Sequence, residues 1–225
     1  MADGVLLDVQ HLKKYFRIGR RQMLHAVDDV SFQIRAGETL GLVGESGCGK
    51  SSLFGALSGL YKYRGSALFG GKELRKARKK LAGQMGFVTQ NPQDQFVGGT
   101  VRQEILAGLK KNPDALRISE EILRGIRLWR YRDVSPYLLS QGQQRRLGAA
   151  ALMACGCRLL VCDEPTYAQD RRSTTAIMDT LCRQARERQA ALIFSTHDAQ
   201  LAKDYADVIW KLEGGVLHAC SQPGL

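Results

Sequence analysis

Eight residues near position 50 have the types and spacing of a phosphate-binding loop. Residues 44–51 read GESGCGKS and follow an apolar run at residues 39–43. They fit the pattern G-x-x-x-x-G-K-[ST], in which backbone N–H groups surround phosphates and a lysine reaches the β- and γ-phosphate oxygens. Lys50 is that lysine, and the Ser51 hydroxyl can ligate Mg²⁺. The sequence therefore predicts a nucleoside triphosphate site.

A strand before this loop and a helix after it would hold the phosphates in place. Leu53, Leu57 and Leu60 are spaced for one face of a helix that starts after Lys50, and Gly59 suits its end. The amino end of such a helix directs partial positive charge at an anion. The residues expected to bind the nucleotide here are Gly44, Glu45, Ser46, Gly47, Cys48, Gly49, Lys50, Ser51 and Ser52.

A second apolar strand, at residues 159–162, ends in two acids. A carboxylate at the carboxyl end of a strand can hold Mg²⁺ through water, the role we assign to Asp163. Glu164 would then polarise the attacking water as a general base. Acids that leave a strand are ordinarily a polar loop, but beside a phosphate loop they indicate hydrolysis of a triphosphate.

The alternation of short apolar runs and helical patterns predicts an α/β fold. It would have a central, mainly parallel sheet, and the opening strands would form an added antiparallel layer. Residues 91–140 carry helical periodicity at 101–111 and 117–128, so we expect a helical insertion in one domain that covers residues 1–225. Gly214 and Gly215 predict a hairpin turn. The expected strands lie at residues 5–9, 30–34, 39–43, 86–89, 158–162, 191–195, 208–212 and 216–219.

The chain is basic, with 33 Lys and Arg against 22 Asp and Glu and a net charge of +11. This balance invites a nucleic-acid or an anionic-membrane interpretation. The densest basic run, residues 72–80, has no interleaved aromatic residue that could stack on bases. A solvated face is therefore favoured first, attraction to a membrane surface second and nucleic acid last, and no nucleic-acid partner is expected.

Composition also argues against a membrane span and against structural disulfides. No apolar stretch approaches the roughly 18 residues of a spanning helix, and the first residues lack the layout of a signal peptide, so a cytosolic protein is expected. The six cysteines lie mostly in apolar patterns, typical of reduced, packed thiols. Cys155 and Cys157 have no second pair or neighbouring His, which disfavours a metal site there.

Residues 139–143, LSQGQ, open an Ala-rich helix and identify a family resemblance. They resemble the Leu-Ser-Gly-Gly-Gln signature of ATP-binding cassette proteins, the ATPase subunits of ABC transporters. Ser140 and the Gly142 backbone, at a helix amino end, can donate to a γ-phosphate, with Gln143 beside them. In the family that phosphate belongs to the opposite subunit. A Ser in this place would otherwise be read as an ordinary N-cap.

The resemblance covers essentially the whole chain and implies further site residues. Gln90 resembles the glutamine that touches Mg²⁺ or the attacking water, and His197 the histidine that contacts the γ-phosphate. Asp170 resembles an aspartate at the dimer interface. The implied catalytic set is Glu164, His197, Gln90 and Lys50, and the implied Mg²⁺ ligands are Ser51, Gln90 and Asp163.

For adenine, the family uses an aromatic residue upstream of the phosphate loop. Phe16 is favoured over Tyr15 as the stacking ring, and Val27 is expected to add an apolar contact. Two positions depart from the family pattern: Gln141 replaces the first signature glycine, and Gln169 alters the segment before Asp170. Neither change removes a catalytic group, so the resemblance implies an active ATPase that uses ATP and Mg²⁺.

Two subfamilies compete. Residues 24–51 resemble the peptide and nickel importer ATPases, whereas residues 90–101 resemble the energy-coupling factor ATPases of vitamin, cobalt and nickel uptake. The second is favoured because residues 90–101 lie where the transmembrane partner should couple. The implied partners are transmembrane subunits and a second cassette, identical or related, at the cytoplasmic face of the membrane. A soluble ABC ATPase that acts on nucleic acid or ribosomes, and a P-loop kinase, are weaker alternatives.

Overall fold

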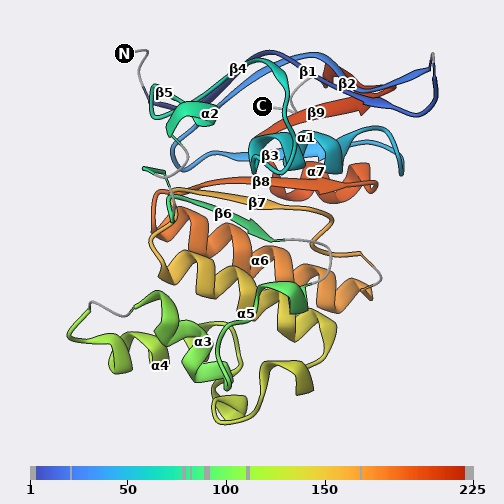
Figure 1. Ribbon diagram of the computed structural model, residues 1–225. Coiled ribbons are helices and arrows are strands. Elements are labelled where there is room, and N and C mark those ends of the chain that lie inside the picture. The colour runs from blue at the N-terminus through green and yellow to red at the C-terminus, as the bar shows by residue number, and fades with distance from the viewer. Residues whose placement is uncertain are drawn as a thin grey trace. The chain divides into compact units, whose positions relative to one another are not determined.

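The computed structural model describes residues 4–20, 22–77, 80–81, 83–88, 92–109, 112–167 and 169–220 (Figure 1). The chain divides into two compact units, one made of Met1–Ala82 with Ile193–Leu225 and the other of Gly83–Leu192. None of the described helices is long and apolar enough to cross a membrane.

The first unit contains a four-stranded antiparallel sheet in the order β2-β1-β4-β5. Its buried side chains include Leu7, Leu12 and Ile34, and buried residues alternate with exposed ones in the last part of β2, as an antiparallel layer with one covered face requires. The strands are β1 (Val5–Arg17), β2 (Met23–Arg35), β4 (Arg64–Phe69) and β5 (Lys72–Glu73).

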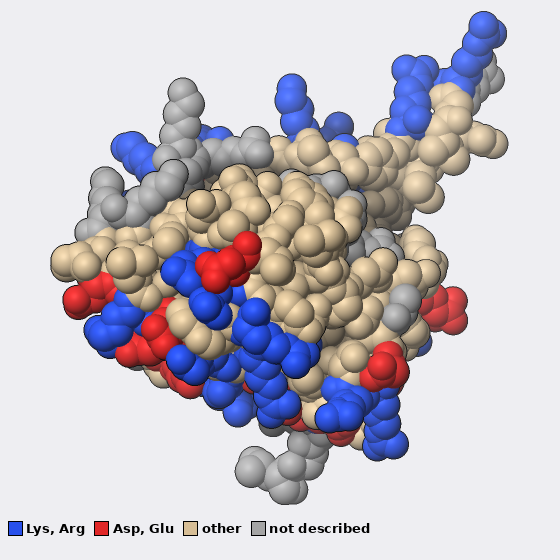
Figure 2. All heavy atoms as spheres, turned by 90° about the horizontal axis from the view of Figure 1, so that it is seen from below, with Lys and Arg blue, Asp and Glu red and all other residues tan. Residues whose placement is uncertain are grey.

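The hairpin of β1 and β2 is much longer than the sequence predicted. Pairing runs from Val5 opposite Arg35 to Arg17 opposite Met23, with register shifts along the way. The half of each strand nearer the turn carries several polar residues, which hides the alternation, but main-chain pairing does not depend on alternation. The end of the hairpin carries Arg17 and Arg20 beside the exposed Ile18, and projects from the body of its sheet (Figures 1 and 2).

A second sheet in the first unit has the order β10-β9-β3-β8. Strands β3 and β9 are parallel, and β9 and β10 form an antiparallel hairpin around Gly214 and Gly215, both with positive φ. The expected hairpin is therefore confirmed. Strand β8 begins in the second unit and ends in the first. The bounds are β3 (Thr39–Val43), β8 (Ala191–Thr196), β9 (Val208–Glu213) and β10 (Val216–Ala219).

Within its described residues, the first unit contains the helices α1 (Lys50–Leu57), α2 (Leu74–Ala77) and α7 (Ala199–Tyr205). Helix α1 is shorter than predicted. It stops at Leu57 because Gly59 takes a left-handed conformation with φ 75°, a common way for a helix to end. Leu60, expected on the buried face of this helix, is instead 70% exposed.

Gly55 of α1 lies against the ring of Tyr61, and this contact makes a testable prediction. A Cβ at position 55 would come within 2.4 Å of a ring carbon. We expect Gly55→Ala to lower the free energy of unfolding by about 1–2 kcal/mol, because overpacking outweighs the gain in helix propensity. Gly125→Ala is the control, since its nearest neighbour would be 3.8 Å away. Equal thermal unfolding midpoints for the two variants would contradict the prediction.

The second unit pairs two parallel strands, β6 (Met85–Val88) and β7 (Leu159–Cys162). Its main helices are α3 (Val101–Gly108), α4 (Ala115–Gly125), α5 (Gln141–Ala154) and α6 (Arg171–Glu187). Short 3₁₀ turns lie at Pro92–Gln95, Trp129–Tyr131 and Pro136–Leu138. The described part of residues 91–140 is helical or irregular, as the sequence predicted. That residues 1–225 act as one domain stays a prediction.

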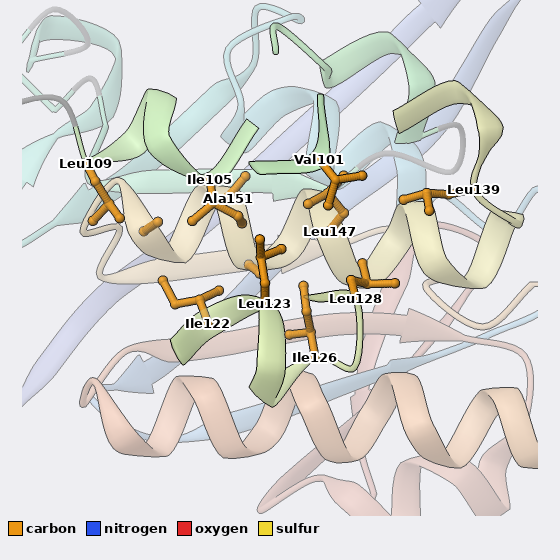
Figure 3. Close-up of a cluster of buried hydrophobic side chains, with 12 residues drawn as sticks. Val101, Ile105, Leu109, Ile122, Leu123, Ile126, Leu128, Leu139, Leu147 and Ala151 are labelled. Atoms are coloured by element: carbon orange, nitrogen blue, oxygen red, sulfur yellow. The ribbon is translucent and has the colours of Figure 1, made fainter. Parts of the chain in front are cut away.

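A hydrophobic cluster holds α3, α4 and α5 together (Figure 3). Ile105 from α3, Leu123 from α4 and Leu147 from α5 are completely buried and point toward a shared centre. Their spacing along each helix follows the 3.6-residue period that predicted these helices. This packing positions the amino end of α5, where the signature residues lie.

Candidate functional site

The phosphate loop connects β3 to α1 and is organised around Lys50. This side chain is only 4% exposed, and its Nζ donates to the carbonyl oxygens of Gly44 at 2.6 Å and Glu45 at 2.8 Å. The loop therefore curves around its own ammonium group. Oxygens of a bound phosphate would take up the same donors, because an ammonium has three N–H groups and prefers anionic acceptors.

Two glycines let the loop approach its neighbours closely. Gly49 has φ 114°, and a Cβ there would lie 2.0 Å from the carbonyl oxygen of Ala26 on β2. A Cβ at Gly44 would lie 2.5 Å from the carbonyl oxygen of Leu212 on β9. These main-chain contacts exclude any side chain. Beside the loop lies a cavity of about 240 Å³, lined by residues 45–48 and 211–214.

His197 follows a residue that is hydrogen-bonded to this loop. The N–H of Gly44 donates to the carbonyl oxygen of Thr196 at 3.2 Å, and Thr196 is buried at the end of β8. The next residue, His197, is exposed. Asp198 then caps α7 by accepting from the N–H groups of Gln200 and Leu201. The fold thus brings His197 to the first residue of the phosphate loop.

The three residues expected to contact adenine lie in different surroundings. Phe16 is half-buried and packs edge-to-face on Tyr61, with ring centroids 5.2 Å apart, and the Lys14 Nζ lies 4.3 Å from its ring centroid. Tyr15 stacks on His25 at 4.0 Å and donates its hydroxyl to Asp28. That hydrogen bond raises the pKa of Tyr15 and lowers the pKa of Asp28.

This arrangement favours Phe16 for the base and corrects one expectation. Val27 is 0% exposed, so its side chain belongs to the core and offers no surface to adenine. Val27 lies outside the strand expected at residues 30–34, so the sequence did not show that its side chain faces the core. Tyr15 is already stacked on His25 and hydrogen-bonded to Asp28, which leaves Phe16 as the better candidate.

The acidic residues follow β7 in the second unit. The N–H of Asp163 donates to the carbonyl oxygen of Val88 at 2.9 Å, so β6 fixes the end of β7. Asp163 and Glu164 are both half-buried. Glu164 takes a left-handed conformation with φ 46°, uncommon for a residue other than glycine. A costly conformation of this kind is typical of a functional position.

Arg145, which the sequence analysis did not single out, holds the loop that follows Glu164. Its guanidinium is 3% exposed and donates from Nη1 to the carbonyl oxygens of Pro165 at 2.9 Å and Tyr167 at 2.7 Å. Burial lowers the pKa of Arg145, and the charge of Glu164 opposes that shift. Helix α5 therefore links the signature to the acidic loop.

Ser140 caps α5 as an N-cap residue. Its Oγ accepts from the N–H of Gln143 at 3.4 Å, and the Gln143 side chain accepts from the Ser140 N–H at 2.9 Å. This reciprocal pair is a capping box. A Cβ at Gly142 would lie 2.7 Å from Oε1 of Gln169. The altered residue before Asp170 therefore lies against the signature glycine.

Asp170 caps α6 in the same way. Its Oδ1 accepts from the N–H of Ser173 at 2.8 Å, and this hydrogen bond lowers the pKa of Asp170. The carboxylate is exposed and lies at the positive end of the helix dipole. It is therefore a fixed negative charge on the surface of the second unit.

The predicted residues thus form one group in each unit. The first unit holds the phosphate loop, Phe16 and His197, and the second holds the acids, the signature and Asp170. Gln90 lies outside the described residues. Ser51 is exposed at the first turn of α1, and Asp163 is half-buried; hydroxyl and carboxylate oxygens of this kind fit Mg²⁺, which prefers hard oxygen ligands.

Comparison with known proteins assigns this arrangement to a family. Residues 27–167, more than half of the chain, match the family described as ABC transporter. The chain belongs to the ABC transporter family. The predicted resemblance and the α/β cassette fold are therefore confirmed.

Individual ABC proteins resemble the chain along most of its length. The putative HMP/thiamine import ATP-binding protein YkoD of Bacillus subtilis is 39% identical over 183 residues, covering 80% of this chain and 33% of YkoD. The oligopeptide transport ATP-binding protein OppF of the same organism is 33% identical over 226 residues, 94% of this chain and 74% of OppF.

A solved structure is similar as well. CbiO1 from Clostridium perfringens, described as part of the ABC transporter complex cbiONQ, has a TM-score of 0.84 at 26% identity, over 98% of this chain and 89% of that one. The cassette spans about a third of the length of YkoD, so the two proteins correspond over one part of YkoD only.

Cys48 of this ABC cassette gives a chemical test of the phosphate loop. It is half-buried within the loop, whereas burial raises the pKa of Cys157 to about 11. At pH 8 roughly one Cys157 thiol in a thousand would be ionised, and the thiolate is the reactive form. We therefore expect N-ethylmaleimide to label Cys48 much faster than Cys157, and ATP with Mg²⁺ to slow the labelling of Cys48 because the phosphates cover the loop.

Mass spectrometry of the labelled peptides measures both rates. Exposed Cys155 in the second unit is the internal control, and its rate should not change with ATP. Labelling of Cys48 that is unaffected by saturating ATP would show that the nucleotide does not cover this loop.

Proposed function

We propose that this chain is the ATP-hydrolysing subunit of an ABC importer of the energy-coupling factor type, which takes up a vitamin or a transition-metal ion. The observation that carries the proposal is the phosphate loop closed around Lys50, together with Glu164 at the end of β7. The first binds a triphosphate, and the second can activate water beside one.

Different residues of the chain would bind ATP and hydrolyse it. Lys50 and the loop amides bind the β- and γ-phosphates, while Phe16 offers a ring to the base. Glu164 accepts a proton from the attacking water, and His197 contacts the γ-phosphate. Bound Mg²⁺, held by Ser51, Asp163 and Gln90, would neutralise phosphate charge.

A second cassette completes each site. Ser140 and the amide of Gly142 lie at the amino end of α5, where helix dipoles favour an anion, and we assign them to the ATP of the opposite subunit. Gln143 and Asp170 lie beside that contact. ATP binding would close the pair of cassettes, and hydrolysis would reopen it. Transmembrane subunits would turn this closure into substrate movement at the cytoplasmic face of the membrane.

Two observations support the energy-coupling factor type. Residues 90–101 resemble that group, and YkoD and CbiO1, named for HMP/thiamine import and the cbiONQ complex, are similar proteins. The competing assignment is a peptide or nickel importer. It is favoured by residues 24–51 and by the similarity to OppF, which extends over 94% of the chain.

Co-purification from native membranes distinguishes these assignments. The chain would be tagged, purified in mild detergent with its partners, and assayed for ATP hydrolysis. We expect a small transmembrane scaffold together with a substrate-binding membrane protein. Two permeases and a separate binding protein would instead identify the peptide or nickel class, and ribosomal or DNA-bound material would contradict transport.

A further inference from the structure

A basic groove lies in the second unit, and its lining includes none of the residues assigned to ATP. It has a volume of about 660 Å³ and runs between α6, the end of α4 and one residue of α5. Four of its lining residues are arginines and one is an aspartate, so the lining carries a net charge of +3 (four positive minus one negative). We call it the arginine groove, defined by Arg127, Arg146, Arg172, Arg183 and Asp179.

Main-chain contacts hold two of these arginines in the groove. The Arg146 Nε donates to the carbonyl oxygen of Ile126 at 3.3 Å, and the Arg183 Nη2 donates to that of Gly125 at 2.9 Å. Both carbonyls lie at the carboxyl end of α4, whose partial negative charge favours cations. A guanidinium has five N–H donors, so each arginine keeps donors for a further acceptor.

The arginines also act on one another. The pKa of Arg146 is lowered first by burial and then by the positive charge of Arg127. Arg127 itself has φ 59°, the left-handed conformation that favours glycine or asparagine at a helix end. At position 127, glycine would be less strained than arginine and would remove the repulsion between Arg127 and Arg146.

Other arginines of the same unit have different surroundings. Arg102, Arg124 and Arg132 lie over the ring of Trp129, with guanidinium carbons 5.4, 4.9 and 4.8 Å from the ring centroid. Each also pairs with a carboxylate, Asp133 or Glu120. The face shown in Figure 2 carries such mixed bands of Lys, Arg, Asp and Glu side chains. The arginine groove differs from these mixed bands because its positive charges outnumber its negative ones.

The shape of the groove indicates what it binds. Arg172 and Arg183 lie eleven residues apart on α6, which corresponds to about 16 Å along the helix. An extended peptide of about five residues spans the same length. Arg127, Arg146 and Arg183 gather at the carboxyl end of α4, and Arg172 lies about three turns away along α6, so a ligand that reaches all four must be extended. The lining includes no aromatic residue on which a base could stack.

We propose that the arginine groove binds a short acidic segment of a protein partner, whose carboxylates pair with Arg127, Arg172 and their neighbours. Guanidinium groups suit this role because their planar N–H pairs match carboxylate oxygens. The inference does not depend on ATP hydrolysis or on the transported substrate. It assigns a function to charges that the ATP site does not use.

Fluorescence anisotropy with a labelled hexaglutamate peptide tests the proposal on the full chain, with hexaglutamine as the neutral match. We expect hexaglutamate to bind and hexaglutamine not to, with an affinity that falls as salt rises. Arg127→Gly should weaken binding about fivefold, the effect of one exposed charge pair. Arg127→Gly with Arg172→Gln should weaken it by more than tenfold. Asp179→Asn should strengthen binding, a gain that misfolding cannot produce.

Matched controls separate charge from folding. Arg117→Gln removes an exposed arginine of α4 outside the groove, and Gln189→Gly relieves a left-handed residue with φ 52° without changing charge. Arg127→Gly should be at least as stable as the original chain, because glycine tolerates that conformation. If Arg127→Gly weakened hexaglutamate binding no more than Arg117→Gln does, the proposal would be overturned. Tight binding of tripolyphosphate at the groove without hexaglutamate binding would also overturn it and indicate a small phosphate anion instead.

Discussion

Replacing Glu164 with glutamine is expected to lower the rate of ATP hydrolysis by at least about a hundredfold while ATP binding stays within about twofold. Glutamine has nearly the same shape and keeps the hydrogen-bonding carbonyl, but it cannot accept a proton from water. The left-handed conformation at this position, φ 46°, is no harder for glutamine than for glutamate. The substitution therefore removes the base and leaves the loop in place.

Phosphate release and binding of a fluorescent ATP analogue measure the two effects separately. Glu187→Gln, at the end of α6 in the same unit, is the control because it removes an exposed carboxylate far along the chain from β7. It should leave both quantities unchanged. Hydrolysis by Glu164→Gln at more than about a tenth of the original rate would assign the general base to another group.

If Glu164→Gln instead lost ATP binding, the carboxylate would be a structural part of the acidic loop. Arg145 holds that loop through two carbonyl oxygens, and the charge of Glu164 acts on Arg145. Thermal unfolding of the variant distinguishes the two explanations. A catalytic role leaves the midpoint unchanged, whereas a structural role lowers it.

The features that the sequence predicted correctly depend on local patterns. The β9–β10 hairpin follows from Gly214 and Gly215 between two apolar runs, and β7 follows from a continuous apolar run. The loop between β3 and α1 follows from the fixed spacing of residue types at 44–51, and its binding of phosphate stays a prediction. The capping box of Ser140 and Gln143 is also local, although only the serine was expected as a possible cap.

The features that it missed depend on contacts between distant residues. Arg145 holds carbonyls 20 and 22 positions away, and nothing in its neighbours predicts that contact. Val27 is buried because β1 and β2 pair along their full length, which the polar second half of β1 conceals. The arginine groove collects side chains from three helices, so its charge is not visible as a run in the sequence. The surroundings of these residues are determined by strand pairing and helix packing, which the periodicity of the sequence does not reveal.

Replacing Lys50 with alanine is expected to weaken ATP binding by about a hundredfold and to abolish hydrolysis with it. The Nζ now donates to the carbonyl oxygens of Gly44 and Glu45, and toward ATP it would supply hydrogen bonds to charged oxygens, worth about 1.5–3 kcal/mol each. Two such bonds account for an effect of that size. Titration with a fluorescent ATP analogue measures it.

Lys203→Ala is the matched control, because it removes an exposed lysine of α7 in the same unit and so makes the same change in net charge. It should bind ATP like the original chain. If Lys50→Ala bound ATP within about threefold of the original affinity, the loop amides and the dipole of α1 alone would hold the phosphates. Lys50 would then serve to close the loop, and Lys50→Ala would lower the thermal midpoint. If Lys50→Ala lost ATP binding but kept its thermal unfolding midpoint, the ammonium group would contact the nucleotide directly. A structural role would have lowered the midpoint as well.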